Sequence, residues 1–374
     1  MLFWRSLRRF FSATTSSSER IVPADEVRSF VVRCMGAVGT KASHAESLAE
    51  LLVTADERGH YSHGLNRLEM YVHDVECKVT AIDAEPVVAN ETPATAFVDG
   101  RNVLGPVAGT LCMEKAISKA RDVGVSWVVC TASNHYGIAG WYAIKAANEG
   151  LIGMSFTNTS PLQVPTRSRQ VALGTNPIAF AAPGVNGDHF VLDMATSTAA
   201  IGKVELHQRK EIPIPTGWGV DSKGNESRSP DAILHGGGLS PLGGTEASSG
   251  YKGYGLATMV EIFCGILAGS AYGPNIRRWM GTEEEANLGQ SFAAINPTMF
   301  APDFSERLAD LLKILRTLQP AEGESEVLVA GDPERRHLSK IKDLGGIPYH
   351  VNMFPAMDKL ADKLNVKRMV PKAT

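Results

Sequence analysis

Short apolar, β-rich runs alternate with helical patterns through the middle of this chain of 374 residues, and this alternation constrains its fold most strongly. The β-rich runs occupy residues 125–133, 152–160, 177–184, 190–197 and 291–300. The helical patterns between them occupy residues 107–124, 139–150 and 253–269. Because strands and helices that alternate along a chain pack as layers of sheet and helix, we predict an α/β fold.

Helical patterns also dominate both ends of the chain. Near the N-terminus, residues 41–59 place their apolar side chains at helical spacing. Near the C-terminus, residues 304–319 and 335–346 have helical patterns, and a short β-rich run at 326–332 separates them. We expect the helices from both ends to pack together.

A proline-containing, β-leaning connector at residues 81–100 separates the helical N-terminal part from the alternating part. This change of pattern predicts a domain boundary near residue 90. We therefore expect a helical domain of residues 20–90, completed by residues 301–374, and a second domain of residues 91–300.

The composition is that of an ordinary globular protein, with 44% hydrophobic and 21% charged residues. The formal net charge is −3 and basic residues cluster only at the extreme N-terminus, which argues against a nucleic-acid partner. The longest apolar region, residues 255–271, carries Glu261 and several glycines, so we predict a buried helix there and no membrane span. The five cysteines are scattered without a CxxC pair, which argues against a cysteine-rich zinc site and for a reducing compartment.

The first 19 residues differ from the rest of the chain. Drawn as a helix, they place Arg5, Arg8 and Arg9 opposite an apolar face, and no acidic residue precedes Glu19. Serine and threonine fill the second half of the stretch. This pattern predicts a mitochondrial transit peptide at residues 1–19 and a location in the mitochondrial matrix. The alternative is a cationic tail on a cytoplasmic protein.

Three of the predicted strands end in polar loops, at residues 133–136, 158–160 and 193–197. In open α/β sheets ligands bind beyond the carboxyl ends of the strands, so we expect a ligand near these loops. His135 lies in the first of them, where a histidine is well placed for acid–base chemistry. The alternative for His135 is an ordinary surface histidine.

Two further stretches offer groups for ligand binding. The hydroxyl-rich turn at residues 193–197 precedes Lys203, and hydroxyls with backbone N–H groups can hold a phosphate, although a capped turn has the same residues. Thr175 and Asn176 form a turn before a strand, which alone indicates only turn chemistry. No strand-borne GxGxxG and no GxxxxGK[ST] motif is present, so an ordinary Rossmann domain or P-loop NTPase is disfavoured.

Titratable side chains crowd into residues 58–71, directly after a helical pattern. If a helix starts near Ser62, with that serine as its N-cap, then His63, Arg67 and Tyr71 repeat every four residues and share one face. Arg67 can then bind a carboxylate while His63 exchanges a proton with a neighbouring hydroxyl. The alternative is a solvated helix face with a capping serine.

His60 and His63 also form an HxxH pair beside Glu57. Zinc in proteins usually has three or four protein ligands, and neither HExxH nor a cysteine ligand stands nearby. We therefore predict no metal site, and a metal-assisted hydrolase that uses His60 and His63 is the rival from another enzyme class.

Seven motifs follow one another in a recognisable order: RGHYSHGLNRL, SNHYGIAGWYA, TNTSP, LGTNPIAFAAP, LDMATS, GGTEASSGYKGYGLA and AINP. Their order and spacing between Val22 and Pro348 resemble the malate/lactate/sulfolactate dehydrogenase family, whose NAD(P)-binding fold is not a Rossmann fold. The resemblance implies a mixed-sheet NAD(P)-binding domain at residues 91–300 and a helical substrate and dimer domain built from both chain ends. It also implies a homodimer.

The resemblance implies roles for individual residues. Its catalytic residues are His63 and His135, one of which transfers the proton. Its substrate-binding residues are Ser62, Arg67, Tyr71, Thr175 and Asn176. Together with Lys203, the expected cofactor-binding residues are Asn158, Thr159, Ser160, Asp193, Met194, Ala195, Gly331 and Asp332. The family more often has glutamate at the position of Asp332.

The implied reaction transfers a hydride between a small 2-hydroxy acid, foremost malate, and NAD or NADP. A 2-hydroxy acid carries a carboxylate beside its carbinol, so a cation must fix one end while a base takes the hydroxyl proton. We expect Arg67 to hold the carboxylate and either His63 or His135 to take the proton. Reduction of a related 2-oxo acid or cyclic imine acid, or nucleotide binding without catalysis, are the alternatives.

Overall fold

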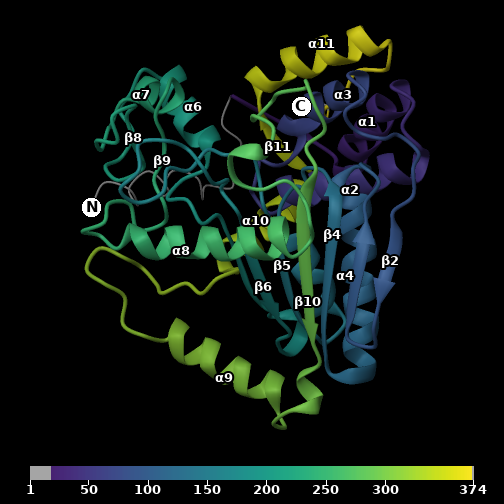
Figure 1. The fold of residues 1–374 in the computed structure, drawn as a ribbon, viewed down its shortest axis with the longest axis vertical. Coiled ribbons are helices and arrows are strands. Elements are labelled where there is room, and N and C mark those ends of the chain that lie inside the picture. Colours follow the sequence, from purple (N-terminus) through teal and green to yellow (C-terminus); the bar gives the residue numbers. More distant parts are fainter. Residues whose placement is uncertain (1–17, 373–374) are drawn as a thin grey trace. The chain divides into compact units, whose positions relative to one another are not determined.

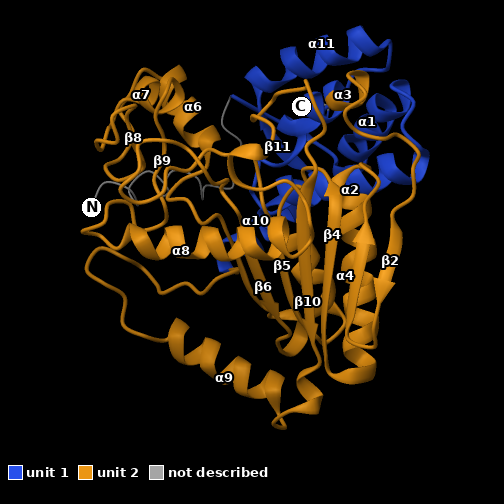
Figure 2. Ribbon diagram, viewed as in Figure 1, with its two compact units in different colours: residues 1–73, 332–374 blue, residues 74–331 orange. Residues whose placement is uncertain are grey.

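The computed structural model describes residues 18–372 (Figure 1). These residues form two compact units (Figure 2). Unit 1 combines the described residues through His73 with those from Asp332 onward, and unit 2 is Asp74–Gly331. The predicted transit peptide lies outside the described residues, apart from its last two positions.

Within the described part of the chain, unit 2 contains a seven-stranded mixed sheet of strand order β2-β3-β4-β10-β5-β6-β7 (Figure 1). Its strands are β2 Val87–Glu91, β3 Thr95–Asp99, β4 Val125–Ser133, β5 Ile152–Thr157, β6 Ile178–Ala182, β7 Phe190–Met194 and β10 Leu288–Ile295. Strands β3 and β4 are parallel, whereas the other neighbouring pairs are antiparallel. The predicted α/β fold with a mixed sheet is confirmed.

The directions of the strands decide which loops meet. Strands β3, β4, β5 and β7 run one way, because β10 is antiparallel to both β4 and β5, and β6 is antiparallel to both β5 and β7. The carboxyl ends of β4, β5 and β7 therefore lie at the same edge of the sheet as the amino ends of β6 and β10. The loops 133–136, 158–160 and 193–197 belong to this edge, as does the turn before β6.

Helices cover both faces of this sheet. Helices α4 (Gly105–Val123) and α5 (Gly140–Asn148) pack on one face. Helix α8 (Gly250–Glu261) and the π-helical turn η4 (Ile262–Ile266) pack on the other, where Phe263 lies against Phe156 of β5. Side chains alternate between the faces of a strand, so Gly153 of β5 points toward α5. A Cβ atom there would lie 2.5 Å from the carbonyl oxygen of Ala143 in α5, which explains the glycine.

The rest of unit 2 consists of short elements and one longer helix. They are η3 Val185–Gly187, α6 Ile201–Arg209, β8 Gly219–Val220, α7 Pro230–Leu234, β9 Gly238–Leu239, η5 Gly273–Asn275, η6 Pro297–Met299 and α9 Phe304–Arg316. The buried side chains of Val204, Ile214, Trp218 and Ile233 give the α6–β9 region a core of its own.

Unit 1 is built from the two ends of the chain. Its helices are α1 Ala24–Ala37, α2 Ala42–Glu57, η2 Leu65–Arg67, α3 Leu68–Glu76 (which continues past the unit boundary), α10 Asp332–Leu344, η7 Val351–Met353 and α11 Phe354–Leu364. Strand β1 (Glu19–Val22) pairs antiparallel with β11 (Ile347–His350) and so joins the N-terminal to the C-terminal segment.

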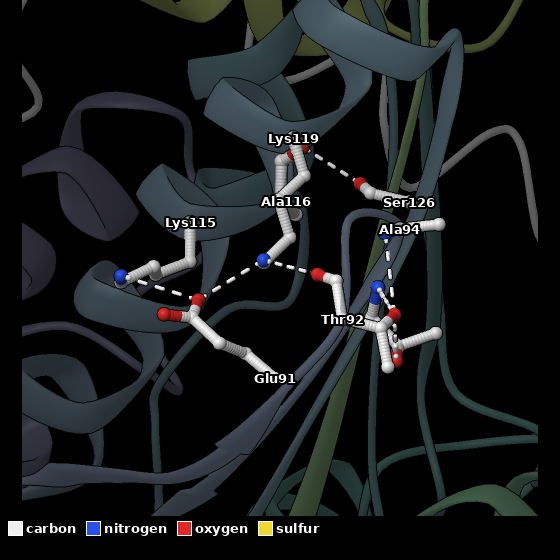
Figure 3. Close-up of polar contacts among 8 residues, drawn as sticks. Glu91, Thr92, Ala94, Lys115, Ala116, Lys119 and Ser126 are labelled. Carbon is white, nitrogen blue, oxygen red and sulfur yellow. Dashed lines mark hydrogen bonds and ion pairs between the residues drawn. The ribbon is translucent and has the colours of Figure 1, made fainter.

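The boundary of the helical part lies elsewhere than expected. The connector 81–100 contributes β2 and β3 to the sheet, so the units divide at Asp74 and not near residue 90. Figure 3 shows why this segment stays with unit 2: Lys119 Nζ of α4 donates to the Thr92 carbonyl oxygen at 2.6 Å and pairs with Glu91 at 3.0 Å. Proline and polar residues mark an edge hairpin here, not a linker.

The expected C-terminal boundary near residue 301 also differs from the structure. Helix α9 belongs to unit 2, where Arg316 donates to both carboxylate oxygens of Asp188 at 2.6 and 2.9 Å, and the second boundary falls at Asp332. The predicted strand at residues 326–332 is wrong. One backbone hydrogen bond, from Val191 N to Ala330 O at 3.2 Å, reaches this stretch from β7, and α10 begins at Asp332.

None of the helices in residues 18–372 has both the length and the apolar character needed to cross a membrane.

Candidate functional site

A tight turn between α2 and α3 carries the polar cluster of unit 1. The helix does not start near Ser62, as expected, but at Leu68, after the 3-10 turn Leu65–Arg67. His63 N donates to His60 O at 2.8 Å and Leu65 N donates to the Asp56 carboxylate at 2.9 Å, and both bonds favour a turn over a helix. His63, Arg67 and Tyr71 therefore do not share one helical stripe.

The turn nevertheless brings three of the predicted residues together. Ser62 Oγ lies 2.9 Å from His63 Nδ1. Arg67 Nε donates to the carbonyl oxygen of Ser62 at 2.7 Å, which fixes the plane of the guanidinium. Tyr71 lies on α3, and its side chain is only 2% exposed. A hydroxyl, an imidazole and a guanidinium thus converge within six residues.

The surroundings of His63 keep its ring neutral near pH 7. The pKa of His63 is lowered to about 4, mainly by burial and to a smaller extent by the neighbouring Arg67 and His60. A neutral imidazole can accept a proton from a bound hydroxyl. An anion on Arg67 would cancel part of the repulsion and make the imidazole a stronger base.

Asp56, which sequence reasoning missed, stabilises the turn through buried hydrogen bonds. Its carboxylate is fully buried, and Oδ2 accepts from Tyr349 Oη at 2.5 Å and from Leu65 N at 2.9 Å. Burial raises the pKa of Asp56 to about 7, although both hydrogen bonds oppose the rise, and nearby Glu57 adds to it. An acidic residue directly after buried Ala55 on a helical apolar face was the available signal in the sequence.

The HxxH pair does not form the centre of a ligand cluster. His60 Nε2 lies 3.6 Å from Glu334 Oε1 of α10, and Tyr61 Oη lies 3.1 Å from His337 Nε2. Across residues 18–372, histidine, cysteine and acidic side chains form no group of three or more with the geometry to hold a metal ion. These contacts tie the turn to α10.

In unit 2, the loop after β5 and the turn before β6 are joined by hydrogen bonds. Thr159 N donates to Asn176 Oδ1 at 3.2 Å, and Thr175 N donates to Thr159 Oγ1 at 2.9 Å. The hydroxyls of Thr159 and Thr175 lie 3.5 Å apart. Thr196, in the loop after β7, donates its hydroxyl proton to the Thr175 and Asn176 carbonyl oxygens at 3.1 Å each. Three loops at one sheet edge therefore form a single network.

The side-chain amides of Asn158 and Asn176, both predicted to bind a ligand, are buried at this sheet edge and hydrogen-bonded within the protein. Asn158 is fully buried, and its side chain donates to Ala271 O at 2.9 Å and accepts from Gly289 N at 2.9 Å. Asn176 is equally buried and donates to Ala257 O at 3.0 Å. Both amides also donate to Glu261. Ser160, at the end of the loop 158–160, is also buried.

The segment at the end of β7 caps one helix and leads into another. Asp193 Oδ2 accepts from Gly140 N at 2.7 Å, so this carboxylate caps the N-terminus of α5. Met194 and Ala195 continue toward α6, whose first turn contains exposed Lys203. No side chain among the described residues caps the N-terminus of α6.

Gly331 and Asp332 lie where unit 2 ends and unit 1 begins. Gly331 has a φ of 99°, a conformation that favours glycine, and Asp332 opens α10 and pairs with Arg335.

His135 follows β4 at the same sheet edge, half-buried, and its Nδ1 accepts from Gly137 N at 3.4 Å. Its ring centroid lies 5.9 Å from that of Trp279, a residue that sequence reasoning did not single out. Arg277, two residues before Trp279, donates to the Asp74 carboxylate at 2.7 Å and anchors this segment. No local sequence signal marks Trp279.

Comparison with known proteins gives a consistent result. Residues 22–358 match the family model described as malate/L-lactate dehydrogenase. Malate dehydrogenase of Pyrococcus abyssi is 39% identical over 349 residues, which cover 92% of this chain and 95% of that protein. L-sulfolactate dehydrogenase of Methanocaldococcus jannaschii is 36% identical over 350 residues, 92% of this chain and 98% of the relative. The solved malate dehydrogenase of Pyrococcus horikoshii OT3 superimposes with a TM-score of 0.87 at 35% identity, over 95% of this chain and 98% of its own.

Two more distant relatives are named with their cofactors. Ureidoglycolate dehydrogenase (NAD(+)) of Escherichia coli O157:H7 is 34% identical over 79% of this chain and 83% of its own. (2R)-3-sulfolactate dehydrogenase (NADP(+)) of Chromohalobacter salexigens is 33% identical over 79% of this chain and 87% of its own.

The predicted location in the mitochondrial matrix is wrong. The relatives from Pyrococcus, Methanocaldococcus and Methanothermus are archaeal proteins, and archaea have no mitochondria. Arginine and serine near the N-terminus misled the interpretation, because a short cationic stretch has the same composition whether or not it directs import.

Proposed function

Because the chain belongs to the malate/L-lactate dehydrogenase family, we propose that it transfers a hydride between a 2-hydroxy acid and NAD or NADP, with malate as the substrate. The enzyme acts on a CH–OH group and depends on NAD(P). Relatives named for malate, sulfolactate and ureidoglycolate bracket the substrate class, and the 39% identity to a malate dehydrogenase favours malate within it.

The observation that carries this function is the turn that holds Ser62, His63 and Arg67. Arg67, oriented by the Ser62 carbonyl oxygen at 2.7 Å, binds the substrate carboxylate. Ser62 Oγ engages Nδ1 of His63 at 2.9 Å, so Nε2 exchanges the proton with the substrate hydroxyl. The carboxylate on Arg67 raises the pKa of His63 from its low value, so that substrate binding itself strengthens the base.

His135 is the second candidate for proton transfer. The Trp279 ring lies beside it. The two histidines belong to different units, and kinetics of the single variants assign the role. Tyr71 lies buried on α3, which follows the turn that ends at Arg67, and it stays a predicted substrate-binding residue.

The residues of unit 2 fit a dinucleotide. Hydroxyls and backbone N–H groups of the loops 158–160, 175–176 and 193–197 meet at one sheet edge, and the uncapped N-terminus of α6 with Lys203 offers a place for phosphate. When bound, NAD(P) supplies the acceptor or donor of the hydride. Thr159, Ser160, Thr175, Met194 and Ala195 line this edge in the proposal, while the buried amides Asn158 and Asn176 hold the loops. Gly331, the last residue of unit 2, and Asp332, the first residue of the C-terminal segment of unit 1, stay predicted cofactor-binding residues.

We further propose a division of labour and a dimer. Unit 1 supplies the substrate-binding turn and unit 2 the cofactor-binding edge. Apolar side chains stand half exposed on η4 and α9 of unit 2, among them Ile262, Ile266, Leu311 and Ile314. Exposed large apolar side chains can belong to a subunit interface, so these two elements are the candidates for the contact in a homodimer. Light scattering coupled to gel filtration measures the mass directly.

The test is a panel of substrates and cofactors on the purified protein after treatment with a chelator. We expect reduction of NAD or NADP with malate, and weaker or no reduction with lactate and sulfolactate. His63→Ala and His135→Ala each remove a group, and loss of the proton-transfer residue lowers kcat by about 10² to 10⁴. Wild-type rates in both variants would refute the assignment of proton transfer to these histidines. Loss of activity on chelation would instead favour a metal-dependent enzyme that uses His60 and His63.

A further inference from the structure

A buried carboxylate lies at the centre of the sheet edge described above. Glu261, the last residue of α8, is only 6% exposed. Its Oε1 accepts from Asn158 Nδ2 at 3.0 Å and from Gly273 N at 3.0 Å, and its Oε2 accepts from Asn176 Nδ2 at 2.7 Å. These three N–H donors supply the hydrogen bonds that burial takes away from the carboxyl group.

The three donors come from three segments that are remote in sequence. Asn158 follows β5, Asn176 precedes β6, and Gly273 opens the stretch that leads to Trp279. Each segment lies at the same sheet edge, and the carboxylate is the group to which all three are bound. A displacement of Glu261 would therefore move every one of them.

A carboxylate suits this position better than an amide does. All three partners donate an N–H group, and an ionised carboxylate only accepts, whereas glutamine must turn its own NH₂ group toward one donor. Asn158 and Asn176 cannot rotate to compensate, because their remaining groups bind Gly289 N and Thr159 N, at 2.9 and 3.2 Å.

The helix also changes form next to Glu261. The π-helical turn Ile262–Ile266 follows at once, and π turns occur frequently at functional sites. At Gly265 in this turn, a Cβ atom would lie 2.6 Å from the Cβ of Tyr272 and 3.3 Å from Asn158 Nδ2. The wide turn and its glycine let the Asn158 loop approach the end of α8.

We propose that Glu261 is a positioning residue for cofactor binding: it locks the loop after β5, the turn before β6 and the segment 271–279 into one arrangement. Through Asn158 and Asn176 it sets where the hydroxyls of Thr159 and Thr175 stand. The inference rests on the proposed function, because it assumes that this edge binds NAD(P).

The test compares Glu261→Gln with Glu114→Gln, a matched control at an exposed position of α4. Melting temperature, the Kd for NADH and NADPH by fluorescence titration, and kcat and KM for the hydroxy acid at saturating cofactor are measured for each. Loss of one hydrogen bond to a charged group predicts a cofactor Kd about tenfold higher or more in Glu261→Gln. We expect less than about a threefold change in the KM for the hydroxy acid, and wild-type values throughout in the control.

The outcomes separate this inference from the proposed function. If the wild-type protein binds neither NADH nor NADPH, the proposed function fails. If the wild type binds and Glu261→Gln binds equally well, or loses only melting temperature, Glu261 is structural and the inference is overturned. Should Glu261→Gln not fold, Glu261→Asp, which keeps the charge but shortens its reach, is measured in the same way. An unchanged cofactor Kd in that variant overturns the inference too.

Discussion

Replacing Asp56 with asparagine isolates the effect of one buried charge on stability. Both donors to Asp56, Tyr349 Oη and Leu65 N, meet the same oxygen, Oδ2. An asparagine can place its one carbonyl oxygen there and its NH₂ group where Oδ1 lies beside Gly64, an oxygen with no hydrogen-bond partner among the described residues. Asp56→Asn therefore reproduces the protonated carboxyl but cannot ionise.

The sign and size follow from the raised pKa. The folded state holds the proton up to about pH 7, whereas the ordinary value is 3.8, so the folded protein binds the proton more tightly than the unfolded chain. Stability from this group is complete below pH 4 and is lost as the pH rises toward 7. About 3 pK units at about 1.4 kcal/mol each amount to about 4 kcal/mol.

The assay is urea unfolding of wild type and Asp56→Asn at a series of pH values from 4 to 8. The difference between their unfolding free energies removes the titration of other groups. We expect the wild type to lose about 4 kcal/mol relative to the variant across this range, and Asp83→Asn, an exposed control, to show no such trend. If the difference in unfolding free energy between wild type and Asp56→Asn stays constant from pH 4 to 8, then the pKa of Asp56 is not raised by burial.

Three shorter predictions concern the site and its support. Arg67→Lys keeps the charge but loses the planar fork, so the KM for the hydroxy acid should rise by about 10² while the cofactor Kd stays unchanged, as steady-state kinetics and titration will show. Since the pKa of free His63 is lowered to about 4, kcat/KM for hydroxy-acid oxidation should stay level from pH 7 to about 5 and fall only near pH 4; a fall centred near 6.5 would contradict this. In Gly140→Ala the new Cβ would lie 2.6 Å from Asp193 Oδ2, so we expect a loss of about 1–3 kcal/mol, measured as a lower melting temperature; an unchanged value would show that α5 can shift.

Local patterns located β4, β5, β6 and several helices, but the run at residues 291–300 is offset from β10 (Leu288–Ile295), and no pattern predicted α11. Strand β4 covers the same residues, 125–133, as its apolar run, because buried strands are apolar along their whole length and end at turn residues. The hairpin β2–β3 at the edge of the sheet has the sequence pattern of a connector. Four of the five residues of β2 are exposed, so it has the composition of a loop.

For the candidate site as well, the sequence predicts what depends on neighbouring residues and misses what depends on remote contacts. Ser62, His63 and Arg67 are close in sequence, so their grouping could be anticipated from spacing alone. The shape of their turn could not, because it depends on Asp56 and on Tyr349, which lies near the other end of the chain. The roles of Glu261 and Trp279 could not be anticipated for the same reason, since only contacts with remote segments reveal them.

Strand β10 lies between β4 and β5, yet it is made more than 130 residues after either of them. While the chain is being synthesised, the edges of β4 and β5 that pair with β10 stay unpaired until residue 295 has left the ribosome. Such long-range pairing slows folding, and bare edges invite association with other chains. A nascent chain stalled before residue 288 should therefore depend on chaperones, whereas one that has released β10 can close its sheet.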